Sequence, residues 1–464
     1  MAPILGDVEP QEPDDATDDR ATGRRSRSSL PVGAFTRGAK LAALPVGFAG
    51  RTALGMGRRI GGAPADAVLT EVQRRTAEQV FSVLGQLKGG AMKMGQAMSI
   101  FEAALPEEIA APYRETLTRL QDAAPPMPVD VVHRQLAAEL GADWRDRLVE
   151  VGDQPAAAAS IGQVHRGRWH DGREVAVKIQ YPGAAKALRS DLRQLSRISR
   201  LLGVLAPGID VKALLQELED RVVEELDYTL EAAAQQRFHE EYADDAEIFV
   251  PSVVHGTERV LVSSWMESTG SLADLIRDGS QDDRDRYGER YVRFLLTSPD
   301  RVGLLHADPH PGNFRVLPDG RLGVVDFGAV AHLPDGLPPA LGPLLTAALA
   351  GDAQAVTDHL RSEGFLRPGT KIDPEVMAGY IAPFVEPAGA ATFTFSRAWL
   401  REQAGRVGLG GEGMSTSMKI NLPPEYLLIH RVWLGGVGVL CQLNATAPFR
   451  SILEESIPGF EPPD

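Results

Sequence analysis

Hydrophobic residues recur at helical spacing in several parts of the chain. Residues 66–102 carry apolar side chains at helical spacing, and residues 211–240 carry the most convincing apolar stripe, among many acidic residues. A further helix is expected over about 129–140, after the proline-rich turn at 125–128. Beyond about residue 334 the pattern is again helical, with glycine-rich breaks. We predict helices in all four regions.

Alternation of apolar and polar residues predicts strands elsewhere. Residues 172–181 alternate as a half-buried strand does, and residues 160–169 precede them across an Asp-Gly pair that favours a tight hairpin turn. Residues 259–266 are also typical of a strand. Residues 313–328 predict a second hairpin about the turn Pro318-Asp319-Gly320. The chain therefore mixes strands and helices.

Composition limits the class of protein. The chain has 464 residues, of which 43% are hydrophobic and 24% charged, an ordinary globular balance for two or more cores. The formal net charge of −15 argues against nucleic-acid binding, which depends on a basic surface. The single cysteine, Cys441, excludes an internal disulfide framework and a cysteine-based zinc site, and residues 1–30 lack the apolar core of a signal peptide. We therefore expect a cytoplasmic protein.

Membrane contact is expected at most at the bilayer surface. No run reaches the roughly 18 apolar residues that a membrane-spanning helix needs. The nearest candidate, 427–443, contains His430 and Arg431 and is predicted to be a buried helix. Residues 41–57 are a candidate for peripheral contact with a membrane, although Pro45 and four glycines disfavour a helix there.

The segment 306–313 (HADPHPGN) and the DFG sequence at 326–328 carry the chemistry. Asp308 precedes Asn313 by five residues, which is the spacing of a kinase catalytic loop. Phosphoryl transfer requires a carboxylate near the attacking oxygen and oxygen ligands that hold Mg²⁺ against the phosphates. The predicted hairpin returns Asn313 and Asp326 to one end of a sheet. We predict ATP and Mg²⁺ as ligands, Asp308 as a catalytic residue, and Asn313 and Asp326 as metal ligands.

Lys178 lies in the sequence VAVK, which matches the strand motif whose lysine pairs with the α and β phosphates. A lone lysine on an amphipathic strand would face solvent by default, but its position ahead of the catalytic loop favours a functional role. A kinase site also needs a glutamate that holds this lysine. The helix predicted over 211–240 supplies Glu219, Glu224 and Glu225 as alternatives.

The expected nucleotide loop departs from the pattern G-x-G-x-x-G. The corresponding residues, 156–163 (AAAASIGQ), are mostly alanine, which permits a close turn but disfavours positive φ. We predict that nucleotide is contacted by Ala157, Ala158, Ala159, Ser160, Lys178 and Met266, the last of which ends the strand at 259–266.

Two other motifs compete with this interpretation. GLGGEG at 408–413 matches a dinucleotide fingerprint, but it follows a helix-like segment and not a strand. We interpret it as a flexible glycine loop, with a dinucleotide oxidoreductase as a distant alternative. His306, Asp308 and His310 alternate as transition-metal ligands could. The kinase interpretation explains them better, with His306 a hydrogen-bonded structural histidine.

Taken in order, these motifs resemble the UbiB/AarF (ADCK-like) family of atypical kinases over most of residues 85–445. KMGQ at 93–96 resembles the KxGQ motif of the family, AAASIGQVH its alanine-rich loop and Glu225-Leu226-Asp227 its ExD motif. VAVKIQYP, HADPHPGN and VVDFGA complete the set. The resemblance implies an α+β, bilobal protein-kinase-like fold with a helical N-terminal extension and extra C-terminal helices.

The resemblance also implies how the chain is divided and which further residues act. The expected parts are a flexible N-terminus at 1–62, a helical KxGQ extension at 63–142, an N-lobe at 143–268 and a C-lobe with a C-terminal helical region at 269–464. In this family the glutamate six positions before the ExD glutamate holds the lysine, which selects Glu219. The KxGQ and ExD residues limit nucleotide use, so regulatory roles are expected for Lys93, Gln96, Glu225 and Asp227.

The activity implied by the resemblance is ATP hydrolysis or phosphate transfer to a non-peptide acceptor, connected with isoprenoid lipids such as quinone precursors. Two local details agree with it. Ala307 stands where an arginine is expected beside the catalytic aspartate, and no A-P-E sequence follows DFG. The alternative is a nucleotide-binding pseudokinase that regulates or scaffolds a biosynthetic complex, which the alanine loop and the missing arginine would also suit.

Overall fold

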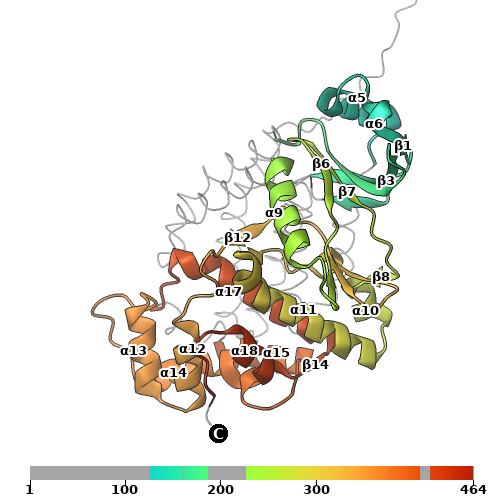
Figure 1. Cartoon of the computed structure of the whole chain (residues 1–464). Coiled ribbons are helices and arrows are strands. Elements are labelled where there is room, and N and C mark those ends of the chain that lie inside the picture. The colour runs from blue at the N-terminus through green and yellow to red at the C-terminus, as the bar shows by residue number, and fades with distance from the viewer. Residues whose placement is uncertain (1–125, 160, 186–225, 408–418, 463–464) are drawn as a thin grey trace, which may run out of the picture.

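The computed structural model describes residues 126–159, 161–185, 226–407 and 419–462. In the described residues a small lobe built on a β-sheet lies above a larger lobe that is mainly helical, and α9 lies between the sheet and the large lobe (Figure 1). The predicted N-terminal helix at 66–102 and the glycine loop at 408–413 lie outside the described residues. The mixed fold agrees with the predicted α+β class.

The small lobe is an antiparallel sheet with the strand order β1-β3-β4-β7-β6, in which β2 also pairs with β3. Its strands are β1 (Leu148–Val151), β2 (Ala157–Ala159), β3 (Gly162–Trp169), β4 (Glu174–Gln180), β6 (Val253–Gly256) and β7 (Val260–Ser264). The predicted hairpin between 160–169 and 172–181 is confirmed as β3–β4. Its turn contains Gly172 at φ 90°, a conformation that glycine adopts without strain.

Alternation along β4 decides which face of this sheet is covered. Val175, Val177 and Ile179 are fully buried, and they pack against α5 (Val129–Leu140) and α6 (Trp144–Arg147) in one apolar cluster. Lys178 therefore points to the opposite face, because successive side chains alternate along a strand. The helix predicted at 129–140 is confirmed, and it shares the core of the small-lobe sheet.

The helix α9 (Tyr228–Glu241) corrects the prediction of one continuous helix over 211–240. Asp227 has an extended backbone and caps α9, so a helix begins at Tyr228 and does not run through this point. Leu230, which the apolar stripe included, is 52% exposed and does not belong to a buried face of α9. Residues 211–225 lie outside the described residues.

The large lobe carries a second, smaller sheet with the order β5-β11-β10-β8. Its strands are β5 (Ile248–Phe249), β8 (Gly270–Ser271), β10 (Phe314–Val316) and β11 (Leu322–Val324). β10 and β11 form the hairpin predicted about Pro318-Asp319-Gly320, with Gly320 at φ 91°. A separate strand pair, β9 (Leu304–His306) with β12 (Val330–His332), flanks the catalytic segment on the chain.

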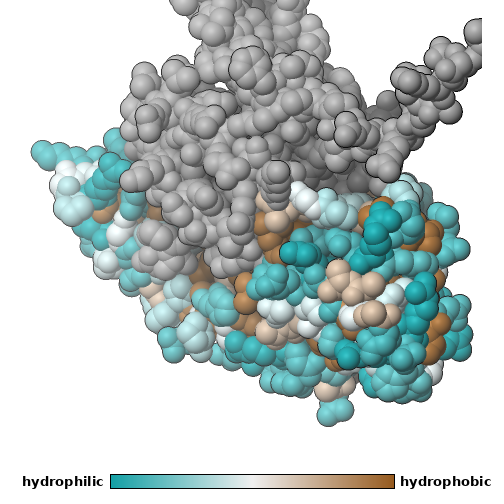
Figure 2. Space-filling view, turned by 90° about the horizontal axis from the view of Figure 1, so that it is seen from above, coloured by the Kyte–Doolittle hydropathy of each residue, from teal (hydrophilic) through white to brown (hydrophobic). Residues whose placement is uncertain are grey.

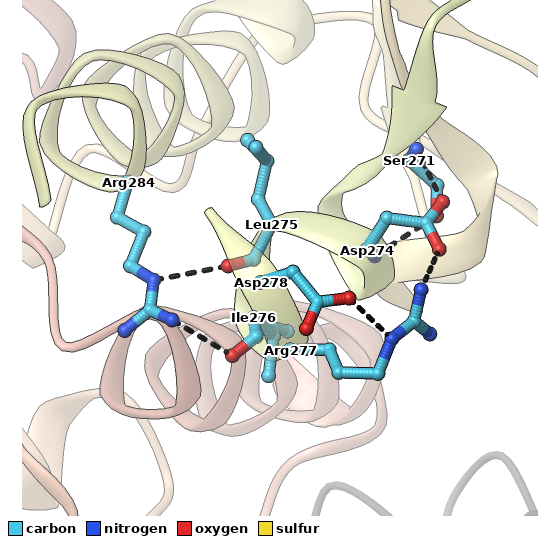
Figure 3. A network of polar contacts seen from close by, with 7 residues as sticks. All are labelled: Ser271, Asp274, Leu275, Ile276, Arg277, Asp278 and Arg284. Carbon is cyan, nitrogen blue, oxygen red and sulfur yellow. Dashed lines mark hydrogen bonds and ion pairs between the residues drawn. The ribbon is translucent and has the colours of Figure 1, made fainter. Parts of the chain in front are cut away.

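Helices α10 (Leu272–Asp278) and α11 (Gln281–Val302) follow β8 along the chain. Ser271 and Asp274 form a capping box at the start of α10, and Arg284 of α11 donates to the carbonyl oxygens of Leu275 and Ile276 near its end (Figure 3). Side chains thus form hydrogen bonds with free backbone N–H groups at the start of this short helix and with backbone carbonyl oxygens near its end.

The C-terminal region is helical, as predicted. It contains α12 (Leu341–Leu349), α13 (Ala353–Ser362), α14 (Pro374–Val385), a 3₁₀ turn η2 (Glu386–Ala388), α15 (Arg397–Val407), α17 (Pro424–Leu443) and α18 (Phe449–Ser456). The short pair β13 (Phe393–Thr394) and β14 (Thr446–Ala447) was not predicted. α17 shares the large-lobe core with α11, and Cys441 is buried in it, which confirms the buried helix predicted at 427–443.

Polar residues dominate the described surface on the face shown in Figure 2, where apolar residues are interspersed among them. A helix long and apolar enough to cross a bilayer was not found in the part of the chain that the structure describes. Residues 41–57, the candidate for peripheral membrane contact, lie outside that part.

Candidate functional site

The segment after β9 holds Asp308, predicted as catalytic, and Asn313, predicted as a metal ligand, in a buried loop. Asp308 and Asn313 are 6% and 7% exposed, and Asn313 Nδ2 donates to the carbonyl oxygen of Asp308 at 3.2 Å. The hydroxyl of Tyr291, on α11, donates to the carbonyl oxygen of Pro309 at 2.7 Å. Burial, together with the charge of Asp308, raises the pKa of Tyr291 well above its ordinary value, so this hydroxyl stays protonated and remains a donor. The loop is therefore fixed to the large-lobe core.

The β10–β11 hairpin brings Asn313 and Asp326 to the same end of the sheet, as the sequence predicted. Phe314 pairs with Val324, and the backbone N–H of Val325 donates to the carbonyl oxygen of Asn313 at 3.0 Å. Asp326 follows at φ 64°, a left-handed conformation that aspartate and asparagine adopt more readily than most residues. Because the amide nitrogen of Asn313 is used on Asp308, its amide oxygen is the atom left for a cation. Carboxylate and amide oxygens are the donors that Mg²⁺ prefers, so this pair fits the predicted metal.

Lys178 connects the two lobes. Its Nζ lies 2.6 and 2.9 Å from the carboxylate oxygens of Glu231 and 3.1 Å from Oδ1 of Asp326. The three side chains are 14%, 4% and 25% exposed. Burial alone would lower the pKa of Lys178, but the carboxylates of Asp326 and Glu231 raise it well above its ordinary value. The lysine is charged at neutral pH and joins β4 to the DFG segment.

Glu231, on α9, is the residue that sequence reasoning missed. The sequence predicted Glu219 as the partner of the lysine, but Glu219 lies outside the described residues, as do the alternatives Glu224 and Glu225. A Cβ placed at Gly328 would lie 3.4 Å from both Oδ1 of Asp326 and Oε2 of Glu231. The glycine of DFG therefore lies directly beside both carboxylates.

His306 is a buried structural residue, in agreement with the prediction. It is fully buried, its Nε2 lies 3.3 Å from the carbonyl oxygen of Val325, and its ring packs edge-on against Phe327. Burial lowers the pKa of His306 despite the nearby charges of Asp308 and Asp326. Within the described ranges, no group of three or more His, Cys, Asp or Glu side chains is placed to hold a metal ion.

Besides Lys178, the described residues predicted to contact nucleotide lie in two segments, strand β2 and the link between the lobes. Ala157, Ala158 and Ala159 form β2, which pairs with Val164, Gln163 and Gly162 of β3, and Ser160 lies outside the described residues. Met266 follows β7 in the segment that links the lobes. A Cβ at Gly323 of β11 would collide with the sulfur of Met266, so the missing side chain leaves room for this methionine. Their contact with nucleotide stays a prediction.

Among the predicted regulatory residues, Asp227 is described, whereas Lys93, Gln96 and Glu225 lie outside the described residues. The Asp227 carboxylate accepts hydrogen bonds from the backbone N–H and the hydroxyl of Thr229 at 2.9 and 2.6 Å. Asp227 therefore has a local structural role as the cap of the helix that carries Glu231.

The alanine-rich motif ends in a buried hydrogen-bonded pair, Gln163 and His165. His165 Nδ1 lies 2.6 Å from the carbonyl oxygen of Gly152, so Nδ1 carries the proton and Nε2 accepts from Gln163 Nε2 at 2.6 Å. The amide oxygen of Gln163 accepts from the backbone N–H of Met127 at 2.8 Å. The pair thus ties the residues before α5 and the β1–β2 connection to β3.

This pair predicts a pH effect on stability. Burial lowers the pKa of His165 below its ordinary value of 6.5, against the opposing influence of its bond to Gly152 and of Asp153. The unfolded chain therefore takes up the proton first, and the stability that neutral His165 contributes is lost as pH falls below about 6.5. We expect His165→Gln to reduce the loss of unfolding free energy between about pH 7 and pH 5, measured by urea denaturation. Equal losses in both proteins would contradict this role.

The described fold and site define a kinase-like protein, and comparison with known sequences supplies the family. The ABC1 atypical kinase-like domain matches residues 119–360. Atypical kinase COQ8B of Rattus norvegicus is 30% identical over 390 residues, which cover 82% of this chain and 71% of that protein. The chain belongs to the ABC1 family of atypical kinases, the UbiB/ADCK group that its motifs resemble.

Two further curated relatives and one solved structure extend the comparison. Atypical kinase coq-8 of Caenorhabditis elegans is 29% identical over 359 residues, 74% of this chain and 46% of that protein. The chain spans about half the length of that protein and of the Synechocystis protein slr1919. A solved complex of Rv3197 with erythromycin, from Mycobacterium tuberculosis, is 42% identical with a TM-score of 0.67 and covers 86% of this chain and 100% of that one.

Proposed function

We propose that this atypical kinase binds ATP with Mg²⁺ and hydrolyses it or transfers its terminal phosphate to a non-peptide acceptor. The observation that carries the proposal is the position of the Lys178 amine between Glu231 and Asp326. An amine from the small lobe and a carboxylate from the DFG segment meet at one point, as phosphate binding beside a metal requires.

Each side chain has a role that its chemistry supports. Lys178 orients the α and β phosphates, and Glu231 holds the lysine in position. Asp308 accepts a proton from the attacking group or positions it. Asn313 and Asp326 hold Mg²⁺, which when bound neutralises phosphate charge. Nucleotide lies against Ala157, Ala158, Ala159, Ser160 and Met266.

Two departures from the features of peptide kinases support a non-peptide acceptor. Ala307, beside Asp308, is 2% exposed and supplies no guanidinium for a phosphorylated activation loop. After DFG the chain passes directly into β12 and not into an A-P-E segment. The family resemblance suggests isoprenoid lipids or quinone precursors as acceptor class, and a peripheral membrane location would bring the enzyme to them.

The test is an ATP turnover assay on the purified chain. Turnover should require Mg²⁺ and should rise with liposomes or with phenols that resemble quinone precursors. Erythromycin belongs in the same panel because Rv3197 was solved in complex with it. Failure to bind Mg-ATP at all would overturn the proposal.

A regulatory pseudokinase is the second candidate. The observation that favours it is β2, where three alanines stand in a strand in place of a glycine loop around the phosphates. This candidate predicts tight ADP binding with no turnover under any of the stimuli above. Mg²⁺-dependent turnover that disappears in a site variant would decide against it.

A further inference from the structure

Arg315, at the centre of β10, has its side chain on the face of the sheet away from the core. Phe314 is fully buried in the large-lobe core, so its neighbour Arg315 points the other way. Arg315 pairs with Gly323 of β11, and paired residues of an antiparallel sheet project from the same face. Met266 covers that face at Gly323. Arg315 therefore lies beside the segment that links the lobes.

The environment of Arg315 is unusual for a charged group. It is half-buried, and among the described residues its guanidinium donates to one group, the hydroxyl of Ser268, at 2.9 and 3.2 Å. Burial lowers its pKa from the ordinary value, and the charge of Asp274 opposes this. A partly desolvated guanidinium whose hydrogen-bond partner is neutral is poorly compensated.

Asp274 does not supply the missing partner, because both of its carboxylate oxygens are engaged elsewhere (Figure 3). Its Oδ2 accepts from the backbone N–H and hydroxyl of Ser271, both at 2.8 Å, and its Oδ1 accepts from Arg277 at 2.8 Å. The carboxylate is therefore committed to capping α10.

The face that carries Arg315 also carries the predicted metal-binding end of the hairpin. Asn313 lies two residues before Arg315, about 6–7 Å along the chain for extended backbone. Lys178 contacts Asp326 beside this end of the hairpin. Ser268, which contacts Arg315, and Met266, which lies against Gly323, belong to the segment that links the lobes. The Lys178 amine thus lies against Asp326 after the hairpin, whereas the Arg315 guanidinium is directed toward Ser268 in the link between the lobes.

We propose that the guanidinium of Arg315 stacks against the base of the bound nucleotide, which makes Arg315 a binding and specificity residue. This inference rests on the proposed function. A planar guanidinium stacks well on an aromatic face, and an electron-rich purine offers such a face where a carboxylate partner is missing. Phosphate is the less suitable partner because the Lys178 amine that would pair with it, and the Asp326 carboxylate that would hold its Mg²⁺, lie together elsewhere in the site.

Calorimetric titration of the purified chain with Mg-ATP and with Mg-tripolyphosphate, which lacks a base, tests the assignment. Arg315→Met is expected to weaken Mg-ATP binding by about 2- to 30-fold and to leave Mg-tripolyphosphate binding unchanged. Arg315→Lys keeps the charge and loses the planar face, so it should weaken Mg-ATP binding selectively as well. This second variant serves if Arg315→Met fails to fold.

Arg321→Met is the matched control, because Arg321 lies on the same hairpin and pairs with Asp319. It should change neither affinity. Equal weakening of both ligands by Arg315→Met would assign the arginine to the phosphates and overturn the proposal, as would no change in either. If the wild-type chain binds tripolyphosphate but gains nothing from the base, the proposal fails while the phosphate site stands. Binding of neither ligand would overturn the proposed function itself.

Discussion

Asp326→Asn is expected to lower Mg²⁺-dependent ATP turnover by a factor on the order of 10²–10³, the usual loss when one stabilising group of a transition state is removed. The amide lacks the negative charge that we propose to hold the cation and that contacts Lys178 at 3.1 Å. Asparagine suits the left-handed backbone at this position, φ 64°, so the fold should be retained. Turnover is measured by phosphate release at saturating ATP over a range of Mg²⁺ concentrations.

Asp319→Asn provides the control for this substitution. Asp319 lies in the turn of the same hairpin, half-exposed and paired with Arg321, and its loss removes the same charge from the same element. Turnover in this variant should match the wild type. If Asp326→Asn keeps full Mg²⁺-dependent turnover, the assignment of Asp326 as a metal ligand is wrong.

Local turn chemistry explains why the two hairpins could be predicted from sequence. Both contain an Asp-Gly pair, and both glycines adopt positive φ, near 90°, in the structure. The helix at 129–140 was equally accessible, because Val132, Leu136 and Leu140 recur at helical spacing and all face the small-lobe core. In these segments one stretch of sequence determines the element.

The start of α9 could not be found from periodicity because two signals conflict there. Apolar spacing continues through Leu226 and Leu230, which favours one long helix, whereas Asp227 is a good N-cap that satisfies the free N–H groups of a new helix. The helix begins after the cap, and on it Leu230 is exposed whereas Glu231 is buried. A search for capping residues inside the predicted helix would have found this signal.

The site was predictable in its sequence motifs but not in its contacts. Lys178 and Asp326 are 148 positions apart, and the order of motifs was enough to predict that both serve one site. The contact of Glu231 with Lys178 depends on how α9 packs against the sheet, which the sequence pattern does not give. The direction of the Arg315 side chain requires less information. Side chains alternate along a strand, so a buried Phe314 already directs Arg315 away from the core.

Glu231→Gln is expected to destabilise the chain by about 1.5–3 kcal/mol, the range for a hydrogen bond to a charged group. The glutamate is 4% exposed and contacts the lysine amine at 2.6 and 2.9 Å, so solvent does little to replace it. The variant should also lose turnover, because Lys178 is then drawn toward Asp326, its other carboxylate partner among the described residues. Urea denaturation and the ATP assay give the two readouts.

Glu219→Gln is the matched comparison, since family resemblance selects Glu219 and the described contacts select Glu231. If Glu231 holds the lysine, Glu231→Gln should lower both the unfolding free energy and the ATP turnover more than Glu219→Gln does. The reverse order would return the role to Glu219. A double variant, Lys178→Met with Glu231→Gln, sharpens the choice: its stability loss should be smaller than the sum of the two single losses, because coupled partners are not additive.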